Sequence, residues 1–289
     1  MTILSLLLVL GAIQIWGSGA PLHKDAWFHE LLAGLRQQSW LRSDLVLFAA
    51  LMIPLAVLGL LMALVSQTLP ILGPLLLNVA VLMYSLERGD FSQAVGRYIE
   101  AANRNDSTQA SYVVDELAVE SFSSETNDWE SLNNEALKAV LYRGFERLFA
   151  VFFWFAILGA PGALLYRMSA LYREGKAIEE FDSSMSSRWL WLMEWPALRI
   201  LGVSWALAGN FVGCIDRWKE CLFCPDRNSS EVLEHYVQGA LSFSESDFQN
   251  DDPAAQAKVS AGQVQAVQSL LSRTLWLWLC VIAVVSLMV

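Results

Sequence analysis

The uncharged run between Arg147 and Arg167 constrains the fold of this chain more than any other stretch. Residues 148–166 are long enough for about one crossing of a hydrocarbon core of roughly 30 Å, since a helix rises about 1.5 Å per residue. The middle of the run reads Gly159-Ala160-Pro161-Gly162, where two glycines surround a proline that has no N–H to donate, so a helix is expected to break there. At membrane depth, such a break requires protein or water around the freed backbone groups. The run is therefore either one kinked spanning helix or a re-entrant helical hairpin.

The composition indicates an integral membrane protein. Of the 289 residues 55% are hydrophobic, 12 are tryptophan, and the mean hydropathy is +0.41. The formal net charge of -10 argues against a nucleic-acid partner, because a phosphate backbone would be repelled. The lipid bilayer is the expected partner, and a small-molecule ligand remains open.

The other apolar runs predict an all-α integral membrane protein with about four transmembrane helices, a re-entrant or broken hairpin and cytoplasmic helical segments. We expect crossings near residues 2–20, 45–65, 69–86 and 273–289. The predicted regions are N-terminal membrane helices with an interfacial segment (1–86), a cytoplasmic polar helical region (87–147), a broken apolar hairpin with interfacial helices (148–215), and cytoplasmic helices with a C-terminal membrane helix (216–289).

The basic residues help to choose between the two interpretations of the broken run. If residues 148–166 and the short uncharged run 200–215 both return to their own side, all 19 Lys and Arg lie on one side of the membrane. The positive-inside rule favours that arrangement and thus favours re-entry slightly. It also places both termini in the periplasm.

The polar segments contain recognisable helix signals. Residues 94–102 are expected to end a helix, and Asp106 with Gln109 three residues later has the form of a helix start, so Asp106 is expected to be an N-cap. The acidic stretch 122–134 is interpreted as a solvated loop before an amphipathic helix over 135–147. Residues 254–272 form another amphipathic segment, followed by a final apolar run.

No phosphate-binding loop, dinucleotide fingerprint or Ser/His/Asp set is visible in the sequence. The candidate binding residues are therefore polar groups near membrane edges: Arg104, Asn105, Asp106, Glu146 and Arg199. We expect Arg104 to lie near Asp106 or Glu146, with Arg199 close by. No catalytic residue or metal ligand is assigned.

The cysteines allow two interpretations. Cys214, Cys221 and Cys224, followed by His235, make a zinc site conceivable, but the spacing matches no standard module. Reduced structural thiols facing a cytoplasm are the favoured interpretation.

Several motifs resemble one family over nearly the whole chain. They are Ala101-Ala102-Asn103-Arg104-Asn105-Asp106-Ser107, Phe152-Phe153-Trp154, Gly159-Ala160-Pro161, Tyr166-Arg167 and Trp195-Pro196-Ala197-Leu198-Arg199. Together they resemble the AmpE family of bacterial inner-membrane proteins, which is similar in turn to the CobD/CbiB adenosylcobinamide-phosphate synthases.

The AmpE resemblance implies a multi-pass protein of the bacterial inner membrane, linked to β-lactamase induction and peptidoglycan recycling. The synthase resemblance implies ATP and magnesium as possible cofactors. However, Arg173 stands where the synthases carry an Asp, and carboxylates are what hold magnesium. The first hypothesis is thus a regulatory or sensory protein that binds a small ligand on a synthase-derived fold. The alternatives are an ATP-dependent amide-bond-forming enzyme and a structural partner of another membrane protein.

Overall fold

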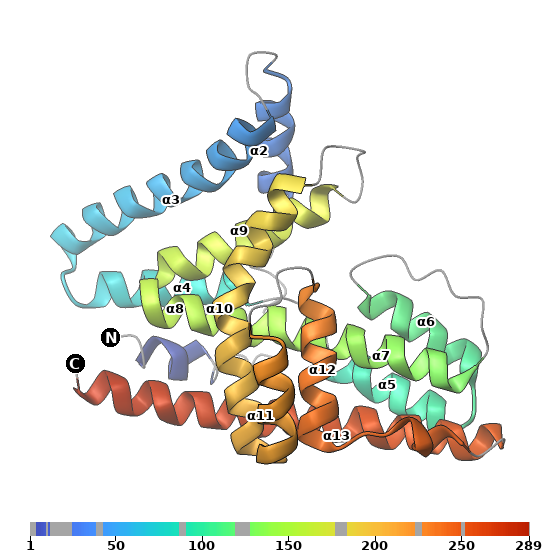
Figure 1. The fold of residues 1–289 in the computed structure, drawn as a ribbon. Coiled ribbons are helices and arrows are strands. Elements are labelled where there is room, and N and C mark those ends of the chain that lie inside the picture. The colour runs from blue at the N-terminus through green and yellow to red at the C-terminus, as the bar shows by residue number, and fades with distance from the viewer. Residues whose placement is uncertain are drawn as a thin grey trace. The chain divides into compact units, whose positions relative to one another are not determined.

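The fold is helical throughout the part of the chain that the computed structural model describes, namely residues 4–9, 11, 25–38, 43–86, 91–118, 128–176, 184–222, 227–249 and 252–288 (Figure 1). No strand occurs in those ranges, which confirms the predicted all-α class. The chain divides into two compact units. Unit 1 comprises residues 1–89, 150–194 and 282–289, and unit 2 comprises residues 90–149 and 195–281.

Unit 1 is built around one long apolar helix and its partners. Helix α3 (Ser43–Thr68) continues through Pro54 and packs against α2 (Ala26–Arg36), α4 (Leu72–Ser85) and α9 (Ala160–Lys176). Its outer face is apolar, with large side chains such as Leu60 (62% exposed) and Met52 (59% exposed). Since isolated soluble domains rarely expose so continuous an apolar surface, this face is suited to lipid.

Two helices in the described ranges are long and apolar enough to cross a membrane: Leu45–Thr68 and Pro253–Val285. The first agrees with the crossing predicted over 45–65. Helix α4 has only 14 residues, shorter than the crossing predicted over 69–86. The crossing predicted over 2–20 falls almost wholly outside the described residues, of which 4–9 are helical.

The break at Gly159 is a true reversal of the chain. Helix α8 (Val151–Leu158) ends at Gly159, whose φ of 68° suits glycine, and α9 begins at Ala160. A Cβ added to Gly162 would meet the carbonyl carbon of Trp154 at 3.0 Å. Residues eight apart would lie about 12 Å apart along a straight helix. The run is therefore a helical hairpin and not a single kinked helix, and its re-entry into the membrane stays a prediction.

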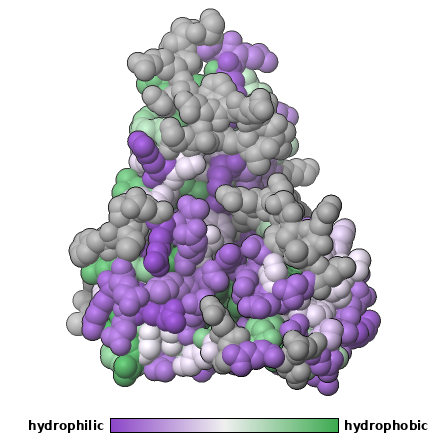
Figure 2. All heavy atoms as spheres, turned by 45° about the vertical axis from the view of Figure 1, so that its right-hand side comes forward, coloured by the Kyte–Doolittle hydropathy of each residue, from purple (hydrophilic) through white to green (hydrophobic). Residues whose placement is uncertain are grey.

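Unit 2 contains α5 (Phe91–Asn103), α6 (Ser107–Leu117), α7 (Trp129–Gly144), α11 (Phe211–Glu220), α12 (Ser229–Leu241), and most of α13 (Pro253–Met288). Helix α7 packs against α5, α6 and α12. Figure 2 brings the α5–α7 side of Figure 1 forward and shows hydrophilic side chains spread over it. This face is suited to water.

Two sequence predictions are corrected in unit 2. Helix α7 begins at Trp129, inside the acidic stretch predicted as a loop, because Asp128 accepts a 3.4 Å hydrogen bond from the N–H of Ser131 and caps the helix there. The segments predicted separately as 254–272 and 273–289 belong to one continuous helix, α13.

The uncharged run 200–215 also reverses direction. Helix α10 (Ser184–Ala208) ends in this run, Gly209 and Asn210 form a turn, and α11 begins at Phe211. The run is thus the tip of a second helical hairpin.

Candidate functional site

The turn between α5 and α6 holds three of the predicted site residues. Asp106 caps α6, since its Oδ1 accepts a 3.0 Å hydrogen bond from the N–H of Gln109. This confirms the N-cap predicted from the sequence. Asn105 adopts a left-handed conformation with φ 56°, and its side-chain oxygen accepts a 2.9 Å hydrogen bond from the indole of Trp129.

Arg104 lies on the surface of this turn. It forms an ion pair with Glu100 at 3.6 Å, and the two side chains are 77% and 72% exposed. Among the described residues Glu100 is its ion-pair partner, in place of the Asp106 or Glu146 that we expected. An exposed pair of this kind contributes about 0 to 1 kcal/mol of stability.

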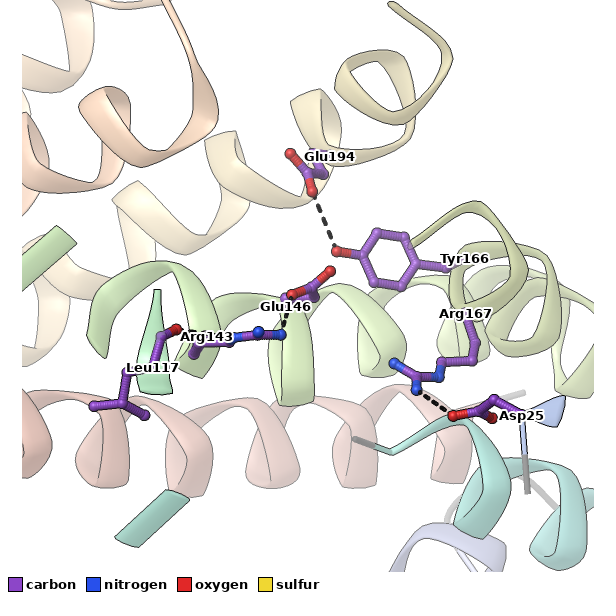
Figure 3. A network of polar contacts seen from close by, with 7 residues as sticks. All are labelled: Asp25, Leu117, Arg143, Glu146, Tyr166, Arg167 and Glu194. Carbon is purple, nitrogen blue, oxygen red and sulfur yellow. Dashed lines mark hydrogen bonds and ion pairs between the residues drawn. The ribbon is translucent and has the colours of Figure 1, made fainter. Parts of the chain in front are cut away.

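Glu146 is buried in unit 2, on a π-helical turn (Phe145–Ala150) that continues α7. Its carboxylate lies 3.5 Å from Nη1 of Arg143, whose Nε donates to the carbonyl of Leu117 at 3.0 Å (Figure 3). Arg143 thus ties the end of α6 to the π-helical turn. Such turns occur frequently at functional sites.

Arg199 is buried on α10 and lies near the end of α11. Its guanidinium carbon lies 5.3 Å from the ring centre of Trp195, and Nε donates to the carbonyl of Leu222 at 3.1 Å. Within the described ranges Arg199 has no carboxylate partner, and its Nη1 has no hydrogen-bond partner. A buried cation without a counter-charge is costly, by several kcal/mol.

Tyr236 of α12 lies beside Arg199. Its side chain is fully buried, and its hydroxyl lacks a hydrogen-bond partner among the described residues. Burial raises the pKa of Tyr236 to about 12, and the Arg199 guanidinium opposes that rise. The phenol is therefore protonated at neutral pH and can donate a hydrogen bond. Gly202 leaves room for the ring, because a Cβ there would meet Tyr236 Cε2 at 2.7 Å.

The structure groups the predicted residues only in part. Arg104, Asn105 and Asp106 share one turn, whereas Arg199 has no ion pair or hydrogen bond to any of the other four among the described residues. The sequence interpretation did not identify Tyr236. No local pattern could have found it, because it reaches Arg199 only through the packing of α11 and α12.

A second polar cluster, which the sequence interpretation also missed, lies in unit 1. Asp25 accepts hydrogen bonds from Tyr84 at 3.0 Å and from Arg167 at 3.3 Å, and so joins α4 and α9 at the start of α2. On α9 the neighbouring Tyr166 donates to buried Glu194 at 3.3 Å (Figure 3). The position of Arg167 directly after the uncharged run was the available signal, since ionisable groups at a membrane edge need partners.

The conceivable zinc site gains no support from the residues that can be described. Cys214 and Cys221 are buried, and Cys221 accepts a 3.1 Å hydrogen bond from Arg227. His235 lies 2.9 Å from Glu220. Within the described ranges no group of three His, Cys, Asp or Glu side chains could hold a metal ion, and Cys224 lies outside those ranges.

Comparisons with known proteins agree with the sequence resemblance. A family model described as "Regulatory signalling modulator protein AmpE" matches residues 1–285. A curated relative, "Cobalamin biosynthesis protein CobD" of Stutzerimonas stutzeri (strain A1501), is 29% identical over 99 residues, which are 32% of this chain and 32% of its own. The match thus spans about a third of that relative. No solved structure matches this chain. Since the family model covers almost every residue, this chain belongs to the AmpE family of membrane proteins.

Proposed function

We propose that this chain is a multi-pass regulatory protein of the bacterial inner membrane that binds a small anionic ligand at Arg199. The family match supports the regulatory role. The observation that carries the ligand proposal is the buried guanidinium of Arg199, which has an unfilled donor at Nη1 and no carboxylate partner in the described ranges.

The surroundings of Arg199 favour an anion with hydrogen-bond acceptors. A ligand carboxylate or phosphate would compensate the buried charge and fill the donors of both Arg199 and Tyr236. The ring of Trp195 holds one side of the guanidinium by a cation–π contact, which keeps the planar donor group oriented. The sequence resemblance implies a link to peptidoglycan recycling, so we propose an acidic cell-wall fragment as the ligand class.

Thermal unfolding of the purified full-length protein tests the binding step. The probes are inorganic phosphate and N-acetylmuramic acid, with N-acetylglucosamine as the matched sugar that lacks the carboxylate. A ligand at 100 times its Kd stabilises the folded state by about 2.7 kcal/mol, so the acidic probe should raise Tm. Arg199→Gln should abolish this rise.

The control variant is Arg217→Gln. Arg217 also lies in unit 2, but its Nη1 already donates to Gln238 at 2.8 Å and contacts His235, so the Nη1 donor is in use there, unlike that of Arg199. This variant should keep the response to the acidic probe. Equal responses of the wild type and Arg199→Gln to every probe would contradict the proposal.

The regulatory step is tested in cells. A strain that lacks the gene is complemented with the wild type, Arg199→Gln or Arg217→Gln, and β-lactamase activity is measured after exposure to a β-lactam. We expect Arg199→Gln to alter induction at normal membrane levels of the protein, and Arg217→Gln to leave induction unchanged.

The Arg104 turn is a second proposed contact for the same kind of ligand. Arg104 is well exposed on a turn whose neighbours Asn105 and Asp106 are held by their own hydrogen bonds. A fixed turn that presents an exposed guanidinium can bind an anion without rearranging. Glu146 is proposed as a positioning group, because its contact with Arg143 holds the end of α6.

An ATP-dependent amide-bond-forming enzyme is the second candidate function. The similarity to a cobalamin biosynthesis protein over 99 residues is the observation that favours it. Purified protein is mixed with ATP, Mg²⁺ and candidate acids, and release of ADP or AMP is measured. Magnesium-dependent release that one acid stimulates would support the enzyme over the regulator.

A further inference from the structure

The hairpin formed by the end of α10 and the start of α11 exposes a row of large apolar side chains. On α10, Ile200, Val203 and Leu207 are 49%, 36% and 61% exposed and share one helix face by their spacing of three and four residues. Phe211 and Val212 begin α11 and are 53% and 69% exposed. This set of five is here called the apolar tip. In water its exposure would be unfavourable, at roughly 25 cal/mol per Å² of apolar surface.

Two backbone N–H groups at the turn of this hairpin have hydrogen-bond partners within unit 2. The N–H of Asn210 donates to the carbonyl of Ala240 at 2.8 Å, and its side-chain oxygen accepts from the N–H of Gly213 at 3.2 Å. Close packing on α12 requires glycine, since a Cβ on Gly209 would meet the Ala240 carbonyl oxygen at 2.6 Å. These hydrogen bonds lower the cost of placing the turn in the apolar part of a bilayer.

The opposite end of α11 is polar. Asp216 and Lys219 form an exposed ion pair at 3.8 Å, and Glu220 is also exposed. Helix α11 therefore changes from apolar to charged over its ten residues. Such a gradient is typical of segments that lie at the boundary between headgroups and acyl chains.

A hydrogen bond connects the hairpin to the apolar part of α13. The indole of Trp278 donates to the hydroxyl of Ser204 at 2.9 Å, and Ser204 lies between Val203 and Leu207 on α10. Trp278 belongs to the candidate membrane span of α13, and its neighbour Trp276 is 69% exposed. The apolar tip is thus joined to the candidate membrane span of α13 through Ser204.

We infer that the apolar tip is an interfacial membrane anchor, with the acyl-chain and headgroup boundary of the bilayer as its partner. The attraction is apolar, because the charged residues of α11 are Asp216, Arg217, Lys219 and Glu220 and their formal charges cancel. Insertion should thus depend little on the fraction of anionic lipid. This inference is independent of the ligand proposed for Arg199.

The test uses full-length protein in vesicles of phosphatidylcholine, with spin labels on single introduced cysteines. The parent variant carries Cys224→Ala and Cys280→Ala and keeps the buried Cys214 and Cys221. Labels are placed at Val212 and Leu207 in the apolar tip and at Lys219 as the matched control on α11. Collision of each label with molecular oxygen, which partitions into lipid, is compared with collision with a water-soluble nickel chelate.

The inference predicts that the labels at Val212 and Leu207 collide preferentially with oxygen. Their collision rate with the nickel chelate should be severalfold lower than that of the label at Lys219, with or without added phosphatidylglycerol. If both labels collide with the chelate as readily as the control, the tip faces water and the inference fails. If they are shielded from oxygen and chelate alike, protein covers the tip and the inference fails as well. Two labelled positions guard against the loss of one variant through misfolding.

Discussion

The indole N–H of Trp129 donates a 2.9 Å hydrogen bond to the side-chain oxygen of Asn105, which joins the first residue of α7 to the turn between α5 and α6. Trp129 is only 3% exposed, so its N–H has little access to water as an alternative partner. Asn105 also holds the left-handed conformation, with φ 56°, that asparagine tolerates better than most residues.

Two substitutions at Asn105 should separate the contribution of the hydrogen bond from that of the left-handed backbone conformation. Asn105→Ala loses the acceptor for a buried donor, at about 1 to 3 kcal/mol, and adds about 1 to 2 kcal/mol of backbone strain. Asn105→Gly loses only the acceptor, because glycine adopts positive φ freely. Thermal unfolding should therefore rank the wild type above Asn105→Gly, and Asn105→Gly above Asn105→Ala. Equal Tm values for the two variants would show that the conformation contributes nothing.

Asp106 should act as a cap and not through its charge. Asp106→Ala removes the acceptor for the N–H of Gln109 and should destabilise the protein by about 1 kcal/mol. Asp106→Asn keeps an oxygen at the same place and should stay close to the wild-type Tm. A large loss of Tm for Asp106→Asn would instead show that the carboxylate charge stabilises the start of α6.

Arg104→Lys tests the proposed ligand contact at the surface turn. Lysine keeps the charge that faces Glu100, so the free energy of unfolding should change by less than about 1 kcal/mol. It loses the planar two-pronged donor geometry, so β-lactamase induction should fall while expression and membrane insertion stay normal. Unchanged induction would remove Arg104 from the proposed site and leave Arg199 as its centre.

Glu234 on α12 should make unit 2 more stable at mildly acidic pH. Burial raises the pKa of Glu234 above its usual value, and the nearby Lys138 opposes the shift. A carboxyl group whose pKa is raised in the folded state binds more protons in the folded than in the unfolded protein. Its contribution to stability therefore falls as the pH rises from the pKa of the unfolded state through the pKa of the folded state. Tm of Glu234→Gln should show less of this decline than the wild type between pH 4 and 8. Glu130→Gln, at an exposed position on α7, is the control. A steeper decline in Glu234→Gln would contradict the assignment.

Local signals made part of this structure predictable. The break at Gly159 follows from a proline between glycines, and the cap at Asp106 follows from its spacing of three residues from Gln109. Both could therefore be predicted from a few neighbouring residues. The start of α7 was missed because an acidic stretch is typical of a loop, whereas Asp128 uses its carboxylate to begin a helix. The continuity of α13 was missed because its polar and apolar halves differ in composition although no residue between them interrupts the helix.

The candidate site was less predictable, because it depends on contacts between distant residues. Arg199 and Tyr236 are 37 positions apart and meet only after α11 and α12 have packed on α10. The surface position of Arg104 and the burial of Glu146 likewise depend on how α5, α6 and α7 pack. The sequence shows which side chains are charged, but tertiary packing decides which charged groups meet.

Helix α13 has a mechanical consequence for unit 2. Its hydrogen bonds include two at widely separated points, where Tyr98 and Ser260 share a buried 2.7 Å hydrogen bond and where Trp278 donates to Ser204. The two points are separated by 18 residues of continuous helix, which is about 27 Å long. A shift of α13 along its axis by one helical turn, about 5.4 Å, would break both hydrogen bonds. A tilt of the whole of unit 2 would keep both bonds, so we expect a change in bilayer thickness near Trp278 to rotate this unit and not to slide α13 along its axis.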